Sequence, residues 1–327
     1  MERGPVFVAG LERSGTSLIF ALLASHPNIA MTRRTNLWTH FYDQYGDLRE
    51  PGNLDRCLEM MIRYKRLLVL QPDADRLRRD FEAGPRTYGR LFALLEEQVA
   101  ERLGRPRWGD KSLNTERYAE PIFDAYPGAR ILHMIRDPRD RYASSYARWK
   151  VRRGGVGAGT AEWLSSVRLA KRNERRFPDR YLIVRYESLA TEPERILREI
   201  CGAIDEPYAP EMLSMGGAPG FREQGSNSSY GRGAPGVIST SSIGKFREVL
   251  SPRQIAFIQR VARVEMASFG YEPEPVRLAL GQRLGFALRD LPVQSAHLVA
   301  WRTRESIRGR TGRRVPAYRL VEREEAA

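Results

Sequence analysis

A glycine-containing turn between an apolar segment and a helical segment constrains the fold more than any other feature of this sequence. Residues 4–10 form an apolar run that is too short for a free-standing helix, which indicates a buried strand. After the turn, apolar residues recur at helical spacing between Thr16 and Pro27, at Leu18, Ile19, Leu22 and Leu23. A strand, a glycine loop and a helix in this order predict the first unit of a parallel α/β sheet.

Three further strand candidates follow, at residues 107–109, 129–135 and 180–186, so the sequence predicts four strands. Residues 50–104 carry apolar residues at helical spacing among many charges, which predicts a helical insertion. Strands that alternate with helices favour a three-layer α/β fold, with a central parallel sheet flanked by helices. We expect one domain over residues 1–274 and a basic C-terminal extension over residues 275–327.

Composition narrows the class of protein. The 327 residues are 42% apolar, which is enough for a substantial core, and they carry a net charge of +14. This charge favours anionic partners such as nucleotide phosphates, without choosing among them. The chain has two cysteines, no apolar stretch of about 18 residues and no secretion signal, so we expect a cytoplasmic protein without a disulfide framework. No pattern of His, Cys or carboxylate residues indicates a metal site.

The loop from Gly10 to Ser17, Gly-Leu-Glu-Arg-Ser-Gly-Thr-Ser, has the glycine spacing of a phosphate-binding turn. Backbone N–H groups can surround a phosphate in such a turn, and the helix N-terminus adds partial positive charge. A kinase or ATPase loop needs lysine after the second glycine, where this chain has Thr16. The cation is instead Arg13, which disfavours a nucleoside triphosphate as the ligand.

A second basic motif follows the strand expected at residues 129–135. In Arg136-Asp-Pro-Arg-Asp-Arg-Tyr-Ala-Ser144, Arg136 lies at the strand end and Ser144 lies two turns into the next helix. Open α/β sheets bind their ligands at the carboxyl ends of the strands. Because both motifs follow strand ends, we expect Arg136 and Ser144 to hold a second phosphate beside the first loop.

Together, Arg13-Ser-Gly-Thr-Ser-Leu18 and Arg136-Asp-Pro-Arg-Asp-x-x-x-Ser144 resemble the sulfotransferase family that uses 3′-phosphoadenosine 5′-phosphosulfate (PAPS). The likeness spans roughly residues 5–271 and is closest to bacterial members and to the tyrosylprotein sulfotransferase branch, where arginine also replaces the loop lysine of cytosolic members. It implies a P-loop NTPase-like fold. It also implies transfer of a sulfuryl group from PAPS, without a metal, to a hydroxyl or amine of a carbohydrate, lipid or other small metabolite.

The resemblance also implies roles for individual residues. Arg13 and Lys111 would neutralise charge on the transferring sulfuryl group. The donor-binding residues that it implies lie in the first loop, the second motif, the last strand and the glycine-rich segment 216–244: Arg13, Ser14, Gly15, Thr16, Ser17, Arg136, Ser144, Tyr186, Ser229 and Lys245.

The acceptor base departs from the family pattern. Family members deprotonate the acceptor with a His or a Glu, but the corresponding positions here are Leu113 and Arg34. Among nearby residues we rank His40 first as the catalytic base, ahead of Asp43, Asp110 and Glu12. The pair Arg33 and Arg34 also favours an acidic acceptor, and an inactive or binding-only relative stays an alternative.

The tail from residue 275 onward contains eleven arginines. Two interpretations are open for it: peripheral contact with an anionic membrane, or a solvated extension packed on the domain. Two other functions are open for the whole chain. One is a P-loop nucleotide kinase, which the missing lysine disfavours, and the other is a non-catalytic protein that binds nucleic acid or another polyanion. The sulfotransferase interpretation expects no nucleic-acid partner.

Overall fold

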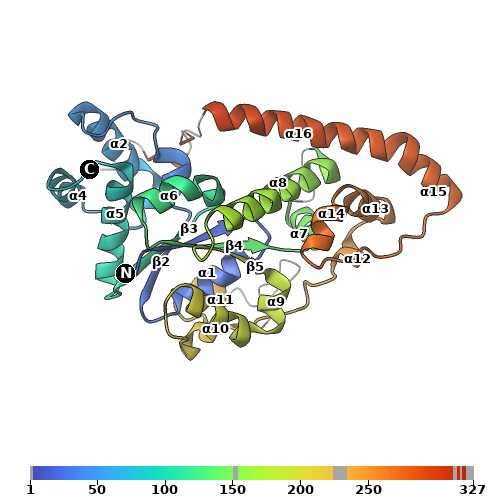
Figure 1. The fold of residues 1–327 in the computed structure, drawn as a ribbon, viewed down its shortest axis with the longest axis horizontal. Helices are drawn as coiled ribbons and strands as arrows, with labels where there is room; N and C mark the ends of the chain where they lie inside the picture. The colour runs from blue at the N-terminus through green and yellow to red at the C-terminus, as the bar shows by residue number, and fades with distance from the viewer. Residues whose placement is uncertain (1–2, 150–153, 224–233, 312–314, 317–318, 322–327) are drawn as a thin grey trace.

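The computed structural model describes residues 3–149, 154–223, 234–311, 315–316 and 319–321. Within these residues, five parallel strands form one sheet in the order β2-β3-β1-β4-β5 (Figure 1). Helices cover both faces of the sheet, so the expected three-layer α/β architecture is confirmed. The strands are β1 (Val6–Gly10), β2 (Ile29–Arg33), β3 (Arg107–Lys111), β4 (Arg130–Ile135) and β5 (Tyr181–Arg185).

Four strands were expected, and the structure corrects this to five, because β2 carries a weak sequence signal. It is an edge strand that pairs only with β3, where Arg33 lies opposite Lys111. Only its first three residues are apolar, which is too short a run to show a strand period. The pairing continues past the strand, since the Arg34 N–H donates to the Lys111 carbonyl at 2.8 Å. The pairing of β2 with β3 therefore places Arg33 and Arg34 beside the end of β3.

Helices fill the segment expected as an insertion: α2 (Pro51–Arg63), α3 (Lys65–Leu68), α4 (Ala74–Glu82) and α5 (Tyr88–Arg102). The other helices before the C-terminal extension are α1 (Thr16–Ala24), η1 (Leu37–Phe41), η2 (Thr115–Tyr118), α6 (Ala119–Ala125), α7 (Pro138–Trp149), α8 (Gly155–Arg176), α9 (Tyr186–Thr191), α10 (Pro193–Ala203), η3 (Pro210–Ser214), α11 (Pro219–Glu223), α12 (Phe246–Val249), α13 (Pro252–Val261) and α14 (Arg263–Ser268).

Successive residues of each strand point to opposite faces of the sheet, so they pack against the two helical layers in turn. Phe7 and Ile131 pack on one face in a core shared with α5 and α6. Val8 and Leu132 pack on the other face in a core shared with α1 and α10. Because all five strands are parallel, their carboxyl ends lie on the same side of the sheet, here called the sheet edge. The loops that follow β1, β3 and β4 leave the sheet there, and they carry both sequence motifs.

The C-terminal extension folds back onto the domain through α15 (Leu280–Gly285), η4 (Phe286–Asp290) and α16 (Leu291–Thr311). Figure 1 shows α16 crossing the molecule alongside α8, against which it packs. Further along, the Val321 N–H donates to the Arg63 carbonyl at 2.9 Å. The described part of the extension is therefore packed on the domain. None of the helices in the described part of the chain combines the length and the apolar character needed to cross a bilayer.

Candidate active site

The first loop turns through left-handed backbone between β1 and α1. Arg13 has φ +69° and Gly15 has φ +90°, and Gly15 occupies the N-cap position of α1 without any side-chain cap. The N–H groups of Leu18 and Ile19 donate to the Gly15 carbonyl, whereas those of Thr16 and Ser17 precede any acceptor in the helix and face the loop. Thr16 and Ser14 are buried there, whereas Ser17 is exposed. This arrangement suits a bound anion.

Gly15 is needed both for its backbone angle and for the space that it leaves. A Cβ at this position would lie 2.6 Å from Cδ2 of Tyr186. We expect Gly15→Ala to destabilise the fold by about 1–3 kcal/mol and to displace the Tyr186 ring. Thermal unfolding measures this effect, with Gly52→Ala as the control because a Cβ there meets nothing within 4 Å. Equal melting temperatures for the two variants would contradict the expectation.

The two basic motifs meet directly. Arg13 Nε donates to Ser144 Oγ at 3.1 Å, although the two residues are 131 positions apart. Arg136 Nη1 donates to the Arg13 carbonyl at 3.2 Å. Ser144 is fully buried and Arg136 is nearly so. The edge of the sheet therefore joins the first loop, the end of β4 and α7 into one cationic site.

Tyr186 and the segment after residue 241 surround the Arg136 guanidinium. Its carbon lies 4.5 Å from the centre of the Tyr186 ring, and Nη2 donates to the Ser242 carbonyl at 2.6 Å. The Tyr186 hydroxyl lies 2.7 Å from Ser242 Oγ. Nε of Arg136 is buried and has no hydrogen-bond partner among the described residues. A buried, unpaired cationic N–H is costly, so this geometry favours a bound anion as its partner.

Asp140 fastens the late segment to α7. Its carboxylate accepts from the Gly244 N–H at 2.7 Å and from the Phe246 N–H at 2.9 Å. Lys245 lies between these two residues and forms an ion pair with Glu248. Ser229 lies outside the described residues. The structure thus brings eight of the ten implied donor-binding residues to one sheet edge, places Lys245 in the segment that Asp140 holds against α7, and leaves Ser229 without a position.

Lys111 ends β3 and is only 6% exposed. Burial and, to a smaller extent, the charge of Arg34 lower the pKa of Lys111 to about 8, while Asp110 opposes the shift. Burial also lowers the pKa of Arg34, and three arginines contribute, namely Arg66, Arg33 and Arg319. The mouth of the site beside Lys111 is therefore strongly cationic.

The base candidates fall in different surroundings. His40 lies in η1, with its ring edge-on to Tyr64 at 6.1 Å, and Asn36 links Tyr64 to Ser112 at the end of β3. Asp43 is exposed. Asp110 alternates with Lys111 along β3 and so faces the opposite side of the sheet, where Thr32 Oγ1 lies 3.2 Å from its carboxylate. Burial raises the pKa of Asp110 to about 6. Asp110 therefore belongs to the packing beneath α5.

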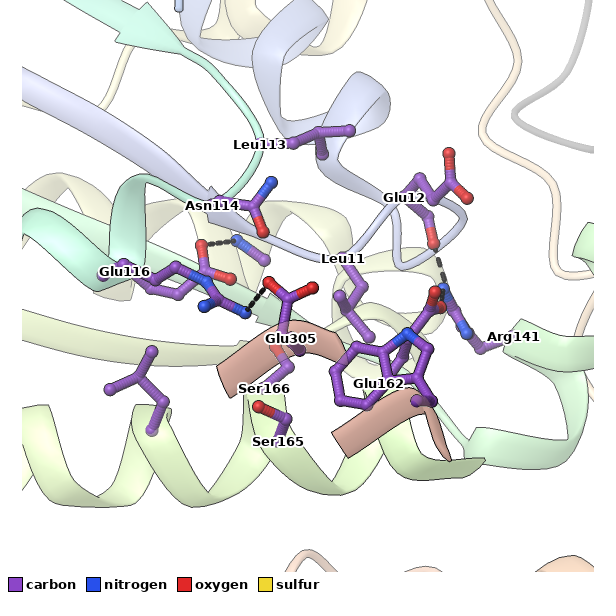
Figure 2. Close-up of a pocket in the computed structure, with 14 residues that line it drawn as sticks. Leu11, Glu12, Leu113, Asn114, Glu116, Arg141, Glu162, Ser165, Ser166 and Glu305 are labelled. Carbon is purple, nitrogen blue, oxygen red and sulfur yellow. Dashed lines mark hydrogen bonds and ion pairs between the residues drawn. The ribbon is translucent and has the colours of Figure 1, made fainter. Parts of the chain in front are cut away.

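A cavity of about 240 Å³ lies between the first loop, the turn after β3 and helices α8 and α16 (Figure 2). Leu11 and Glu12 line it immediately before Arg13, and Leu113 and Asn114 line it just after Lys111. Serines of α8 and residues of α16 form other parts of its lining. Of the base candidates, only Glu12 is among the lining residues that the structure describes. Because residues of the first loop and of the turn after β3 line it, this cavity is the candidate acceptor site.

Sequence reasoning missed two polar residues that line this cavity, Glu116 and Ser166, and the buried His133 and Tyr181 pair behind Ser166. Glu116 is buried, and one of its carboxylate oxygens accepts from the Gly10 N–H at 3.3 Å. Ser166 Oγ lies 2.9 Å from Nε2 of His133, whose Nδ1 lies 2.6 Å from the Tyr181 hydroxyl. Burial lowers the pKa of His133. No local motif marks these residues, because they come from four separate elements.

A loop with left-handed backbone between a central strand and a helix, joined to a second basic motif at the same sheet edge, defines a P-loop-like α/β protein. A family model described as the sulfotransferase family matches residues 5–210. The match covers more than half of the chain, and this protein therefore belongs to the sulfotransferase family, whose members are transferases. The resemblance inferred from the two motifs is thereby confirmed.

Solved structures support the same fold. The sulfotransferase domain of the Synechococcus PCC 7002 olefin synthase has a TM-score of 0.56 and 20% identity, over 84% of this chain and 98% of that one. The sulfotransferase domain from the curacin biosynthetic pathway has a TM-score of 0.52 and 21% identity, over 83% of this chain and 99% of that one. The expected P-loop-like fold is confirmed.

Curated relatives match at lower coverage. A protein-tyrosine sulfotransferase of Drosophila melanogaster is 24% identical over 218 residues, which is 64% of this chain and 39% of that protein. Protein-tyrosine sulfotransferase A of Caenorhabditis elegans is 24% identical over 215 residues, which is 64% of this chain and 51% of that protein. The chain thus spans about half or less of the length of these two relatives.

Proposed function

We propose that this protein transfers the sulfuryl group of PAPS to a hydroxyl or amine of a carbohydrate, lipid or other small metabolite and releases 3′-phosphoadenosine 5′-phosphate. The observation that carries the proposal is the contact between Arg13 and Ser144 at 3.1 Å. It joins the loop suited to a 5′-phosphosulfate with the motif suited to a 3′-phosphate. A donor with phosphates at both positions spans such a site.

The residues present fit this donor. Thr16, Ser17 and the first-turn N–H groups of α1 would hold the 5′-phosphate. Arg136 and Ser144 would hold the 3′-phosphate, which would give the unpaired Nε of Arg136 a partner. Tyr186, packed between Gly15 and Arg136, would lie near the adenine. Ser229 and Lys245 complete the proposed set.

In the reaction, the bond between sulfur and the 5′-phosphate oxygen breaks and a bond between sulfur and the acceptor oxygen or nitrogen forms. Arg13 and Lys111 neutralise the charge that spreads over the sulfuryl and bridging oxygens. The acceptor proton leaves to a base, and we propose His40 for this role, with Glu12, the base candidate that lines the cavity, as the alternative. Loss of the acidic limb of the kcat profile in His40→Gln would support it, and an unchanged limb would contradict it.

The experiment that tests the donor site is calorimetric titration with adenosine 3′,5′-bisphosphate at moderate salt and without magnesium. AMP and ATP are the controls. We expect micromolar binding that depends on the 3′-phosphate. Equal binding of AMP, or tighter binding of ATP when magnesium is added, would overturn the proposal, and the second result would favour a nucleotide kinase.

Lys111 predicts a basic limb in the pH profile. Its ammonium must be protonated to neutralise charge, and the pKa of this buried group is about 8. We expect kcat/KM for PAPS to fall roughly tenfold per pH unit above that pKa, since kcat/KM reports the free enzyme. The measurement is a pH series of initial rates. In Lys111→Arg the limb should move to higher pH, because guanidinium stays protonated. A limb that stays in place would contradict this role.

The proposal includes a cytoplasmic location. Both cysteines, Cys57 and Cys201, are buried free thiols, which suits a reducing compartment. Fractionation of cells that express a tagged chain tests the location and any peripheral membrane contact of the extension. Release from membranes by moderate salt would indicate contact through its arginines.

A further inference from the structure

Helix α16 is seated on a glycine surface at the start of α8. A Cβ at Gly157 would lie 2.0 Å from the carbonyl oxygen of Gln294, which is closer than atoms can approach. The Gly157 N–H instead donates to Gln294 Oε1 at 3.0 Å. Only glycine allows this approach of the two backbones. The position of α16 therefore depends on the glycine at position 157 of α8.

From this seat, α16 reaches the cavity that the first loop and the turn after β3 line. Trp301 and Glu305 both line the cavity, and both come from the extension. Glu305 Oε1 lies 2.8 Å from Nη2 of Arg117 in η2. The Glu305 side chain is 12% exposed, so the ion pair is shielded from solvent on that side. The pair fastens α16 to the turn that follows Lys111.

The cavity that results combines apolar and polar lining residues. Its volume is about 240 Å³. Leu11, Leu113, Leu169 and Trp301 give it an apolar part, whereas Asn114 and Ser166 give it neutral hydrogen-bonding groups. The lining also contains four carboxylates and two arginines, and two of the carboxylates, Glu162 and Glu305, form ion pairs with Arg141 and Arg117. A lining of this kind suits an acceptor with an apolar body and one polar group.

We propose that α16 is a wall of the acceptor site, that Trp301 determines acceptor specificity, and that the acceptor is a small molecule with an apolar body and a hydroxyl or amine. This inference rests on the proposed function and deepens it. The family match ends at residue 210, so the wall lies outside the matched segment. Acceptor choice is thus set partly by the extension, whereas most of the proposed donor-binding residues lie in the matched segment.

The test measures kcat/KM with PAPS and four acceptor probes: 2-naphthol, tyramine, 1-hexanol and a tyrosine-containing peptide. The variants are Trp301→Ala, Trp301→Phe and Gly157→Val, with Arg304→Ala as the control because Arg304 is exposed on the same helix. Hydrogen exchange of α16 checks that Gly157→Val releases it. Titration with adenosine 3′,5′-bisphosphate checks the donor site of every variant.

We expect the full chain to use at least one small probe better than the peptide. Trp301→Ala and Gly157→Val should lower kcat/KM for that probe at least about tenfold with unchanged bisphosphate affinity, whereas Trp301→Phe and Arg304→Ala stay close to wild type. Values within about twofold of wild type in both disruptive variants would overturn the inference. A higher kcat/KM for the peptide than for every small probe would also overturn the inference. The same holds for a protein that binds the bisphosphate but turns over none of the probes. Absence of bisphosphate binding in the wild type would instead overturn the proposed function.

Discussion

Replacing Arg13 with alanine is expected to lower kcat by about 10²–10³-fold while the affinity for adenosine 3′,5′-bisphosphate stays within about threefold of wild type. Arg13 is held at the loop by Ser144 at 3.1 Å and by left-handed backbone at φ +69°. We propose that the Arg13 charge acts on the group in transfer, so its loss should lower the rate more than the bisphosphate affinity. Single-turnover rates with PAPS, measured beside calorimetric titration, separate the two effects.

Arg13→Lys is the control for this prediction. It keeps a positive charge in the loop, as the cytosolic members of the family do, and should retain much of the rate that alanine loses. A melting temperature close to wild type would show that both variants are folded. An equal loss of rate and of bisphosphate affinity in Arg13→Ala would contradict the assignment, because it would mean that Arg13 binds the donor in the ground state.

Replacing Arg136 with alanine is expected to weaken bisphosphate binding about 100-fold, which corresponds to about 3 kcal/mol. Arg136 is 4% exposed and its guanidinium lies over the Tyr186 ring, with Nη2 held by the Ser242 carbonyl and Nε without a hydrogen-bond partner in the described part of the chain. A phosphate at Nε and beside Ser144 would lose its charge partner in the variant. The affinity for AMP, which lacks the 3′-phosphate, should change little. The measurement is the ratio of the bisphosphate affinity to the AMP affinity in wild type and in the variant.

Two variants control this second prediction. Arg136→Lys keeps the charge but loses the planar fork, so its affinity should be intermediate. Arg148→Ala removes an exposed arginine from the same helix α7 and should leave both affinities unchanged. An unchanged bisphosphate affinity in a folded Arg136→Ala protein would show that the second motif does not bind the 3′-phosphate.

Much of the donor site was predictable because its signals are local. The strand at residues 4–10 appears as β1, and the helix expected between Thr16 and Pro27 appears as α1. Glycine spacing, apolar period and a terminating proline act within a few residues of one another, so a short sequence contains them completely. The second motif, Arg136 to Ser144, was predictable for the same reason, because it directly follows the apolar run that forms β4.

The acceptor side was not predictable in the same way. The weak edge strand β2 was missed, although it places Arg34 beside Lys111. The Ser166 and His133 pair was also missed, because it joins a helix to a central strand 33 residues earlier. His40, ranked first from the sequence, lies near the end of β3 through Tyr64 rather than in the cavity lining.

The sequence by itself determined the family, the α/β class and the two cationic motifs, since these depend on residue types at fixed local spacing. Only the tertiary structure decided that Arg13 meets Ser144 and that α16 closes one side of the cavity. Contacts between segments 100 or more residues apart depend on how the sheet and helices pack. A local pattern predicts which face of an element is buried. It does not predict which distant element packs against that face.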